Sequence, residues 1–564
     1  MEKRQNFVFV TGGVLSGIGK GTTASSIGLL LRSYGFRVSA VKIDPYLNTH
    51  AGNMSPLEHG EVYVLDDGTE CDLDLGNYER FLDIVLGRSN SITTGQIYEQ
   101  VIKNEQQGIY LGKTVQIVPH ITDEITKRII EAGQMKVTDI NGVIGIPEIV
   151  IVELGGTVGD WESEPFFNTL SHFPKPCCFI HVGLLVDNNK ELKTKPLQHS
   201  VEALFSRGVI PDILCVRTTW DIQDVPETIV KKIARSCHVK NEKAVILSGK
   251  VDNIYYVPKM LHEQGICEII CAKLGLLWRG TLRPNFDSYN KILDHFTELP
   301  VAPTRIGIVA KYASKGTSDT YLSLERALDH ASFFTNTNLK FEYIDAEYCD
   351  ENIDAFDGII IPGGFGERGI GGKIKAIAKM RQTKTPLFGL CLGMQLMAIE
   401  ECRIDQPHPE HFNGIEFDSE CDHPVTRYVD ATTKEMRLGI KTVRIEPGTL
   451  AYKAYIEMGV GTNTEDGCII VQERHRHRFQ VINDIIYSIS RDAELKYSGW
   501  SGDSEIPEIM ETTVDGWWAI GTQFHPEYIS RNNRPHPLFV EFIKQSKKRA
   551  KNFKWDREYI NVGC

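Results

Sequence analysis

Short runs of β-branched and other apolar residues recur along the chain, separated by longer segments in which apolar residues return at every third or fourth position. Buried parallel strands have continuous apolar runs, whereas amphipathic helices show the helical period. The runs in the first half lie at residues 7–10, 38–43, 148–154, 178–186, 213–216 and 244–247. A second series begins after residue 300, at residues 305–309, 357–361 and 386–390. The pattern predicts an α/β protein with two doubly wound domains.

The segment between the two series predicts a domain boundary. It contains DSYNKILDHF, which has helical periodicity, followed by the proline-stiffened connector LPVAPT. We therefore place the first domain at residues 1–280, a linker helix at 281–302 and the second domain at 303–546. Residues 547–564 form a basic tail, for which a solvated, frayed helix end is favoured over a binding arm.

Composition excludes several classes of function. The 564 residues include 62 Lys and Arg against 74 Asp and Glu, and the net charge of −12 argues against the broad basic surface of a nucleic-acid-binding protein. Apolar runs stop well short of the roughly 20 residues of a membrane span, and the N-terminus lacks a secretory signal. The 13 cysteines show no repeated CxxC spacing, which favours reduced thiols. We expect a cytoplasmic protein that binds neither nucleic acid nor membrane.

A glycine-rich turn follows the first predicted strand. In FVFVTGGVLSGIGKGTTASS, a strand leads into an amphipathic helix, so that backbone N–H groups and the helix N-terminus point at an anion. Lys20 is placed to reach the outer phosphates of a nucleotide. The spacing departs from the strict G-x4-G-K-[ST] loop, because five residues separate the two glycines and Gly21 follows the lysine. Thr22 or Thr23 would supply the hydroxyl, and a glycine turn of a dinucleotide-binding fold remains an alternative.

Acidic residues near other predicted strands suit a divalent cation beside the phosphates. VSAVKIDPY places Lys42 and Asp44 at the carboxyl end of a strand, where open α/β sheets bind ligands. Asp74 lies in DLDLGNYERF, and Glu153 lies near the end of IVIVEL. Because Mg²⁺ prefers carboxylate, phosphate and water oxygens, we predict Asp74 and Glu153 as its ligands. We expect a solvated loop for the other acidic residues of this region, Asp66, Asp67, Glu70 and Asp72.

The second half of the chain contains a candidate nucleophile. In PLFGLCLGMQLMAIE, a strand, the turn G-L-C-L-G and a helix succeed one another, as in a nucleophile elbow with cysteine in the serine position. The helix N-terminus behind Cys391 favours the reactive thiolate. Downstream, QFHPE offers His525 to activate the thiol and Glu527 to orient the imidazole. Alternation in an extended segment would place these two side chains on one face.

Backbone donors complete this candidate site. PGGFGERG supplies N–H groups around Gly364, and the N–H of Leu392 follows the nucleophile, so both can stabilise an oxyanion. A Cys–His–Glu set over such an elbow resembles the class I glutamine amidotransferase domain, whose thiolate releases ammonia from a carboxamide. The cationic segment ERHRHRF suggests metal or RNA binding, but its interleaved arginines disfavour the first and its shortness the second. We expect anion recognition by Arg478 and packing of its neighbours.

A phosphate site and an ammonia source in one chain predict an ATP-dependent amination, and the motifs together resemble the CTP synthase family. The resembling segments, in family order over nearly the whole chain, are TGGVLSGIGKG, KIDPYLN, MSPLEHGEV, DLDLGNYERF, YLGKTVQIVPHIT, ELGGTVGD, KTKPLQHS, PGGFGERG, GLCLGMQL, EMRLG, ERHRHRF and QFHPE. The resemblance implies a P-loop synthase domain of the dethiobiotin-synthetase type, followed by a class I glutamine amidotransferase domain.

The resemblance also implies roles for individual residues. It implies an ATP site at Gly17, Ile18, Gly19, Lys20, Gly21, Thr22, Asp74 and Val251, with Mg²⁺ on Asp74 and Glu153. It implies a UTP and CTP surface at Ser16, Lys42, Asp160, Trp161, Glu162, Lys193, Thr194, Lys195, Pro196, Leu197, Gln198 and Lys232. The implied catalytic triad is Cys391, His525 and Glu527, and the implied glutamine pocket is Gly364, Leu392, Gly393, Met394, Gln395, Glu416 and Arg478.

The implied reaction converts UTP to CTP. ATP phosphorylates O4 of the uracil ring, and ammonia from L-glutamine then displaces the phosphate at C4. The resemblance further implies GTP as allosteric activator, CTP as feedback inhibitor, homotetramers and filaments. Two alternatives remain open. One is a P-loop amidotransferase of the cobyrinate amide synthase type, against which DLDLG and KTKPLQHS argue. The other is a P-loop switch or filament-forming scaffold with a vestigial glutaminase.

Overall fold

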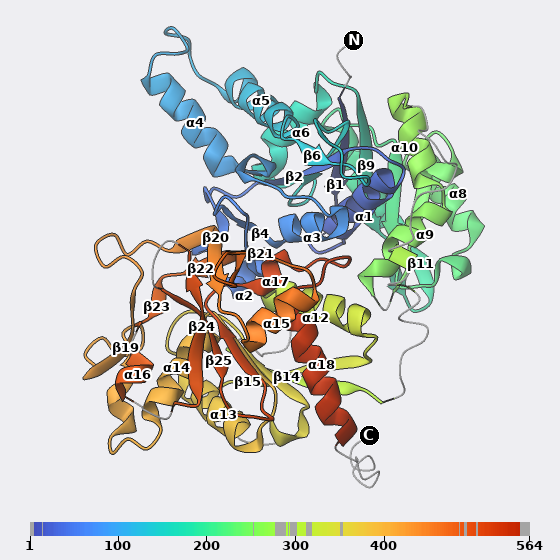
Figure 1. Cartoon of the computed structure of the whole chain (residues 1–564). Coiled ribbons are helices and arrows are strands. Elements are labelled where there is room, and N and C mark those ends of the chain that lie inside the picture. Colours follow the sequence, from blue (N-terminus) through green and yellow to red (C-terminus); the bar gives the residue numbers. More distant parts are fainter. Residues whose placement is uncertain are drawn as a thin grey trace. The chain divides into compact units, whose positions relative to one another are not determined.

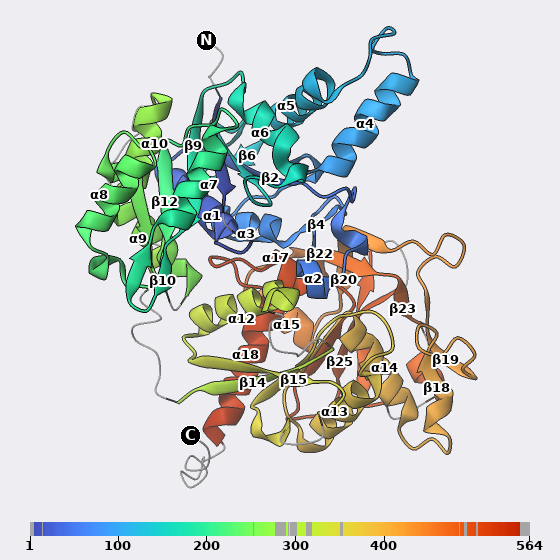
Figure 2. The same cartoon turned by 180° about the vertical axis from the view of Figure 1, so that it is seen from behind.

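Contacts along the chain separate its residues into two units. Unit 1 consists of Met1–Asn53 and Glu70–Leu293, and unit 2 consists of Met54–Thr69 and Asp294–Cys564. Figure 1 and Figure 2 show the computed structural model, which describes residues 5–13, 15–251, 253–276, 289, 290, 293, 302–311, 318–349, 353–483, 485–489, 493–502 and 506–552. The segment Met54–Thr69 belongs to unit 2, although the sequence assigned it to the first domain. Most of the linker helix expected at 281–302 lies outside the described residues.

A parallel sheet forms the centre of unit 1. Within the described residues its strands run in the order β13-β12-β9-β1-β8-β2-β5, and each pair is parallel. The strands are β1 (Asn6–Gly12), β2 (Val38–Asp44), β5 (Ser91–Thr93), β8 (Ile149–Leu154), β9 (Cys177–Leu184), β12 (Ile213–Arg217) and β13 (Val245–Ser248). The strands predicted in the first half are confirmed, with small shifts at their ends. Because β1 is central, the glycine turn after it opens at the middle of the sheet's carboxyl edge.

Helices cover this sheet. On one face, Phe7 and Phe9 of β1 share an apolar core with Ile97, Ile125 and Phe167, which come from α4, α5 and α6. Helix α1 packs against β1, β2 and β8. The helices are α1 (Lys20–Ser33), α3 (Leu73–Leu82), α4 (Thr94–Gln106), α5 (Thr122–Ala132), α6 (Glu164–Ser171), α7 (Lys195–Phe205), α8 (Glu227–Ser236), α9 (Val257–Glu263) and α10 (Ile266–Leu274). Short strands are β4 (Glu70–Asp72), β6 (Val137–Thr138), β7 (Ile144–Gly145), β10 (Val186–Asn188) and β11 (Glu191–Lys193).

A longer, mixed sheet forms the centre of unit 2. Within the described residues its order is β15-β14-β16-β17-β26-β25-β24-β20-β22-β21. The strands from β15 to β26 are parallel, and the remainder are antiparallel. They are β14 (Thr304–Ala310), β15 (Leu339–Asp345), β16 (Gly358–Ile361), β17 (Leu387–Leu390), β20 (Arg437–Ile445), β21 (Thr462–Asn463), β22 (Ile469–His477), β24 (Leu495–Ser501), β25 (Pro507–Thr512) and β26 (Ala519–Thr522). The strands predicted after residue 300 are confirmed, but the antiparallel extension was not predicted.

Two apolar cores lie on the two faces of this sheet. Ile359 and Ile361 of β16 pack with α13 and α14, whereas Ile360 between them packs with α12 and α18, as strand alternation requires. The elements are α2 (Pro56–His59), β3 (Val62–Val64), α12 (Leu322–Thr335), α13 (Ile370–Thr383), α14 (Leu392–Arg403), α15 (Leu450–Glu457), α16 (Ile485–Ile489), α17 (Pro526–Ile529) and α18 (Pro537–Asn552). A small sheet joins β18 (Phe412–Gly414), β19 (His423–Tyr428) and β23 (Phe479–Val481).

The basic residues near the C-terminus cap other helices. Helix α18 continues to Asn552, past the domain end expected at residue 546. The Lys547 ammonium donates to the carbonyls of Thr335 and Asn336 at 3.0 and 2.8 Å, at the end of α12. Arg549 donates to Thr383 at the end of α13. Cations stabilise helix C-termini, so the expectation of a frayed end is wrong for these residues. Residues 553–564 of the expected tail lie outside the described part.

The described cysteines are all free, as the sequence predicts, and most of them are buried. Among the described residues, no helix is long and apolar enough to cross a membrane.

Candidate active sites

The glycine turn of unit 1 joins β1 to α1. Gly19 caps the helix with a φ of 89°, a left-handed conformation that favours glycine. A side chain at position 21 would clash, because a Cβ atom at Gly21 would lie 2.1 Å from Oδ1 of Asp74. The ammonium of Lys20, the first residue of α1, donates to the carbonyl of Gly156 at 2.7 Å. The turn therefore brings a helix N-terminus, a lysine and a carboxylate together at the carboxyl edge of the sheet.

The ammonium of Lys42 lies among acidic residues at the carboxyl edge of the sheet. It lies 2.6 Å from Oδ2 of Asp74 and 3.0 Å from Oδ1 of Asp72. Oδ1 of Asp44 is 3.3 Å away. Burial lowers the pKa of Lys42, but the three carboxylates outweigh it and hold that pKa well above its usual range. The expectation of a solvated loop is wrong for Asp72, which pairs with a buried lysine, and for Glu70, which is itself buried.

Glu153 lies buried on β8, where the hydroxyl of Tyr78 donates to its carboxylate. Burial raises the pKa of Glu153 to about 8, and the charge of Asp74 adds to the rise. A divalent cation stabilises carboxylates that otherwise disfavour each other's ionisation. The site thus contains the oxygen donors that Mg²⁺ prefers, close to the phosphate loop, and Asp74 and Glu153 are the residues that could hold the ion.

A cavity of about 210 Å³ extends from the phosphate loop. Gly19 and Thr22 line it at the start of α1, and Val251 lines it after β13. Residues of the predicted ATP site that are far apart in the sequence therefore line one cavity. Arg217 at the end of β12 also lines it and lies 3.5 Å from the carbonyl of Gly17. The sequence analysis missed Arg217, although a cation directly after a predicted strand is a signal that could have revealed it.

Cys391 lies at the sharp turn between β17 and α14. Its φ of 52° is unusual for a residue other than glycine. The flanking glycines are required by close packing, since a Cβ atom at Gly393 would lie 2.2 Å from the carbonyl oxygen of Ile361. The Cys391 N–H donates to the carbonyl of Thr522 on β26 at 2.6 Å. This is the strained strand–helix turn that the sequence predicts, and it places Leu392 at the first position of α14, where its N–H has no helical partner.

His525 and Glu527 meet beside Cys391. Nδ1 of His525 lies 2.7 Å from Oε1 of Glu527, and His525 lines the same cavity as Cys391, whose thiol donates to the carbonyl of Arg476 at 3.6 Å. Burial lowers the pKa of His525, but the charges of Glu527 and Cys391 outweigh it and raise that pKa to about 10. The predicted pairing is therefore present, but the reasoning behind it was wrong. His525 precedes helix α17 and does not lie in an extended segment.

Two buried lysines hold the loop that follows β16. Lys373 donates to the carbonyl of Pro362 at 2.9 Å, and Lys311 donates to the carbonyl of Phe365 at 3.2 Å. Burial lowers the pKa of both lysines, that of Lys311 to about 8. Gly364, between these carbonyls, has a φ of 153°. With its carbonyls held by lysines, the loop can present backbone N–H groups to an oxyanion.

The triad faces a cavity of about 90 Å³ that Gly364 also lines. Arg476 of β22 also lines this cavity, and its guanidinium lies 5.1 Å from the ring centre of Phe365. Arg478, which the sequence analysis selected, is exposed and outside the lining. Apart from Arg476, its neighbours in ERHRHRF are buried, as predicted; for example, His475 contacts Glu508 at 2.9 Å.

Three other residues expected in the glutamine pocket, Glu416, Gln395 and Met394, lie outside this lining. The carboxylate of Glu416 accepts the N–H of Gly366 at 2.8 Å. Burial raises the pKa of Glu416, and the charges of Lys311 and Arg478 oppose that rise. The buried Gln395 donates to the carbonyl of Phe479 at 2.9 Å. Met394 is fully buried.

Comparisons with known proteins identify both halves. The family model described as CTP synthase N-terminus matches residues 6–276, and the model described as Glutamine amidotransferase class-I matches residues 317–545. A CTP synthase of Carboxydothermus hydrogenoformans is 42% identical over 97% of this chain and 99% of its own length. The chain belongs to the CTP synthase family. A CTP synthase of Methanocaldococcus jannaschii is likewise 42% identical, over 96% of this chain and 99% of its own length.

A solved structure of the Trypanosoma brucei CTPS glutaminase domain with bound acivicin is also similar. It is 32% identical, with a TM-score of 0.38, over 43% of this chain and 94% of that chain.

Of the residues that CTP synthase resemblance links to UTP and CTP, Ser16 lies in the glycine turn and Lys42 on β2, and the others lie in three further parts of unit 1. Asp160, Trp161 and Glu162 follow β8, and the Trp161 side chain is 90% exposed. Residues 193–198 join β11 to α7, where Thr194 accepts a hydrogen bond from the Gln198 amide at 2.9 Å. Lys232 lies exposed on α8. In the part of the chain that the structure describes, no hydrogen bond or ion pair joins these three parts.

The CTP synthase motif MSPLEHGEV begins the segment Met54–Thr69, which lines the triad's cavity with Pro56, Glu61 and Val62. The Tyr528 hydroxyl donates to the carbonyl of Val62 at 3.1 Å. The Tyr528 ring also stacks on the imidazole of His525, with centroids 4.8 Å apart. The sequence analysis missed this segment as part of the glutaminase site.

An ion pair with the buried Arg474 anchors the same segment. Nε of Arg474 lies 2.6 Å from Oδ1 of Asp66, and its Nη1 donates to the hydroxyl of Tyr63 at 2.7 Å. The Tyr63 hydroxyl in turn donates to the carbonyl of Tyr528 at 2.7 Å. The expectation of a solvated loop is therefore wrong for Asp66, although Asp67 is exposed.

Proposed function

We propose that this chain aminates UTP to CTP, with ammonia that it releases from L-glutamine and with ATP as the activating co-substrate. The observation that carries the proposal is the presence of two sites in one chain. Unit 1 carries the phosphate loop with Lys20 and a neighbouring cavity, and unit 2 carries Cys391 and a bonded His–Glu pair around one cavity. Membership of the CTP synthase family supports joining these two chemistries into one reaction.

The glutaminase half-reaction uses the triad of unit 2. His525 accepts the thiol proton of Cys391, and the sulfur attacks the carboxamide carbon of glutamine. The oxyanion that forms is stabilised by backbone N–H groups of Gly364 and Leu392. Collapse of this intermediate expels ammonia, which takes its proton from His525, and leaves a glutamyl thioester that water hydrolyses. Glu527 keeps the imidazole oriented and stabilises its charged form.

The synthase half-reaction uses the loop of unit 1. O4 of UTP attacks the γ-phosphorus of ATP, ADP leaves, and ammonia then displaces the phosphate from C4. Lys20 and Lys42 would stabilise the negative charge of the transferring group, and both lie among the carboxylates of this edge. Mg²⁺ held by Asp74 and Glu153 would supply Lewis-acid stabilisation of the phosphates.

Several finer features follow from the family and are part of the proposal. These are GTP activation, CTP feedback inhibition, a homotetramer that assembles into filaments, and a cytoplasmic location. We also assign UTP and CTP binding to Ser16, Lys42, residues 160–162, residues 193–198 and Lys232. The domain division at residues 1–280, 281–302, 303–546 and 547–564 stays a prediction.

Product analysis tests the proposal. The purified chain is incubated with ATP, Mg²⁺ and UTP, with either glutamine or ammonium as nitrogen source, and nucleotides are separated by chromatography. CTP is expected from either source, and GTP is expected to raise only the glutamine-dependent rate. Amination of a corrinoid acid with no CTP would favour an amide synthase of the cobyrinate type. Nucleotide-dependent assembly without glutaminase turnover would favour a scaffold.

A further inference from the structure

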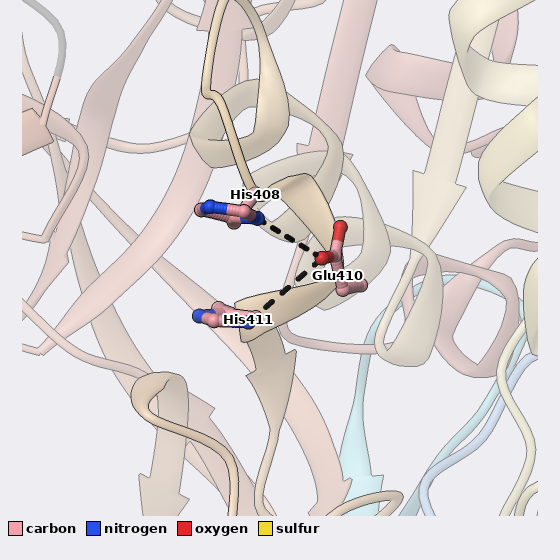
Figure 3. A group of neighbouring side chains, drawn as sticks. All are labelled: His408, Glu410 and His411. Carbon is pink, nitrogen blue, oxygen red and sulfur yellow. Dashed lines mark ion pairs between the residues drawn. The ribbon is translucent and has the colours of Figure 1, made fainter.

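Two histidines and a glutamate gather on the surface of unit 2, away from the triad's cavity lining (Figure 3). His408 precedes a short 3-10 turn, Pro409–His411, between α14 and β18. The turn places the Glu410 carboxylate beside the two imidazoles, where it contacts both, as Figure 3 shows. The prolines at 407 and 409 flank His408 and restrict the backbone there. The glutaminase chemistry uses none of these side chains.

The spacing of the donor atoms suits one metal ion. Nδ1 of His408 lies 3.4 Å from Oε1 of Glu410, and Nε2 of His411 lies 3.8 Å from the same oxygen. One ligand atom from each residue fits within a group of 4.8 Å span. Ligand atoms about 2.0–2.1 Å from a tetrahedral ion are about 3.3 Å apart, so only small rotations of exposed side chains separate this arrangement from coordination geometry.

A second carboxylate orients one of the imidazoles. Nδ1 of His411 lies 3.0 Å from Oδ2 of Asp422, just before β19. A histidine whose Nδ1–H is held by a carboxylate directs its Nε2 lone pair outward, and this pairing recurs behind metal-bound histidines. In this case the outward atom is the same Nε2 that faces Glu410. The cluster therefore contains three candidate ligands and one side chain that positions a ligand.

The local charges also favour a cation. Glu410 contributes a carboxylate, and a ring nitrogen of each imidazole lies within 4.0 Å of one of its oxygens. Arg403 is the nearby basic side chain, but its Nε donates to the carbonyl of Phe412 at 2.9 Å. Two imidazoles and one carboxylate match ions such as Zn²⁺, whereas Mg²⁺ prefers an all-oxygen set.

We propose that His408, Glu410 and His411 bind one Zn²⁺-type divalent transition metal ion, with Asp422 as the positioning residue for His411. The fourth position of a tetrahedral ion would hold water, because the cluster is exposed. Bound metal would fix the turn after α14 and hold His411 against Asp422, just before β19, and so stabilise this edge of unit 2. The proposal does not depend on the amination reaction.

Calorimetric titration of the full chain with Zn²⁺ tests the proposal, with excess Mg²⁺ to occupy all-oxygen sites. The double variant His408→Ala/His411→Ala is expected to bind one equivalent fewer than the wild type. His423→Ala is the matched control, since this exposed histidine is adjacent to Asp422 but outside the cluster, and it is expected to bind as the wild type does. Equal stoichiometry and affinity in the wild type and the double variant would overturn the proposal, as would loss of the equivalent in His423→Ala.

Two further measurements test the positioning role of Asp422 and the effect of bound Zn²⁺ on stability. Asp422→Asn is expected to weaken the same equivalent about 10- to 100-fold, and an unchanged affinity would contradict the positioning role. Zn²⁺ is expected to raise the thermal unfolding temperature of the wild type but not that of the double variant. All four side chains are exposed or half-exposed, so circular dichroism of the metal-free variants is expected to match the wild type. A wild-type unfolding temperature that does not respond to Zn²⁺ would contradict the stabilising role.

Discussion

Cys391 has a backbone conformation that costs a residue other than glycine about 1–3 kcal/mol. The cost is offset by fixed surroundings. Its N–H is bonded to Thr522, and the turn is confined by Gly389 and Gly393, neither of which leaves space for a Cβ atom. In return, the sulfur projects at the start of α14, within reach of His525. A strained residue beside a histidine that a carboxylate orients is typical of a nucleophile.

Replacement of Glu527 by Gln tests the account of His525. Glu527 is the first of the charges that raise the pKa of His525 to about 10, so its removal lowers that pKa. Glutaminase kcat/KM is expected to fall about 10²- to 10⁴-fold. The basic limb of its pH profile is expected to move to lower pH, because the imidazolium loses its proton earlier. CTP formation from ammonium is expected to persist.

The matched control is Glu541→Gln on helix α18, whose carboxylate lies outside the cavity lining. It is expected to leave the glutaminase pH profile unchanged. A basic limb that stays in place in Glu527→Gln, with the rate reduced, would show that Glu527 does not set the charge state of His525.

At the scale of elements, strand β20 packs closely against the segment Met54–Thr69. The Ile440 N–H donates to the carbonyl of Asp66 at 2.9 Å. Gly439 makes this approach possible, because a Cβ atom there would lie 2.5 Å from the backbone nitrogen of Gly68. Its φ of 76° also favours glycine. The glycine of the EMRLG motif therefore has a packing reason as well as a conformational one.

Gly439→Ala is expected to destabilise unit 2 more than a matched glycine substitution. Gly467 also has a positive φ, of 83°, but a Cβ atom there meets nothing within 4 Å. Gly467→Ala is expected to cost about 1–2 kcal/mol from backbone conformation alone. Gly439→Ala is expected to cost about 1–3 kcal/mol more, because backbone atoms must move. Chemical denaturation followed by fluorescence measures both, and equal losses would contradict the packing role.

The sequence predicted the positions of strands and helices better than it predicted contacts between residues that lie far apart along the chain. Buried parallel strands such as β1 and β8 have continuous apolar runs, so their positions and the glycine turn between β1 and α1 follow from local pattern. The pairing of Asp66 with Arg474 spans several hundred residues, and no local signal marks it. The same reason explains why Arg476 was missed, since only the fold shows that it lines the triad's cavity.

At the scale of the whole molecule, net charge and ligand charge have opposite signs. The chain carries −12, yet its proposed substrates include two nucleoside triphosphates. Cations are concentrated where anions would bind. Lys20 and Arg217 lie at the phosphate loop of unit 1, and Arg476 lies at the triad of unit 2. The positions of the charged residues therefore indicate the charge of the ligand better than the net charge of the chain does.

The central claim is a division of labour between the two units, and steady-state CTP formation from UTP with glutamine or with ammonium tests it most directly. Cys391→Ala is expected to lose glutamine-dependent CTP formation but to retain the ammonium-dependent rate, because the thiol serves only ammonia release. Lys20→Ala is expected to lose at least about 10²-fold with both nitrogen sources, because its ammonium would stabilise phosphoryl transfer. Loss of both activities in a folded Cys391→Ala variant, or a near-normal ammonium-dependent rate in Lys20→Ala, would contradict the account.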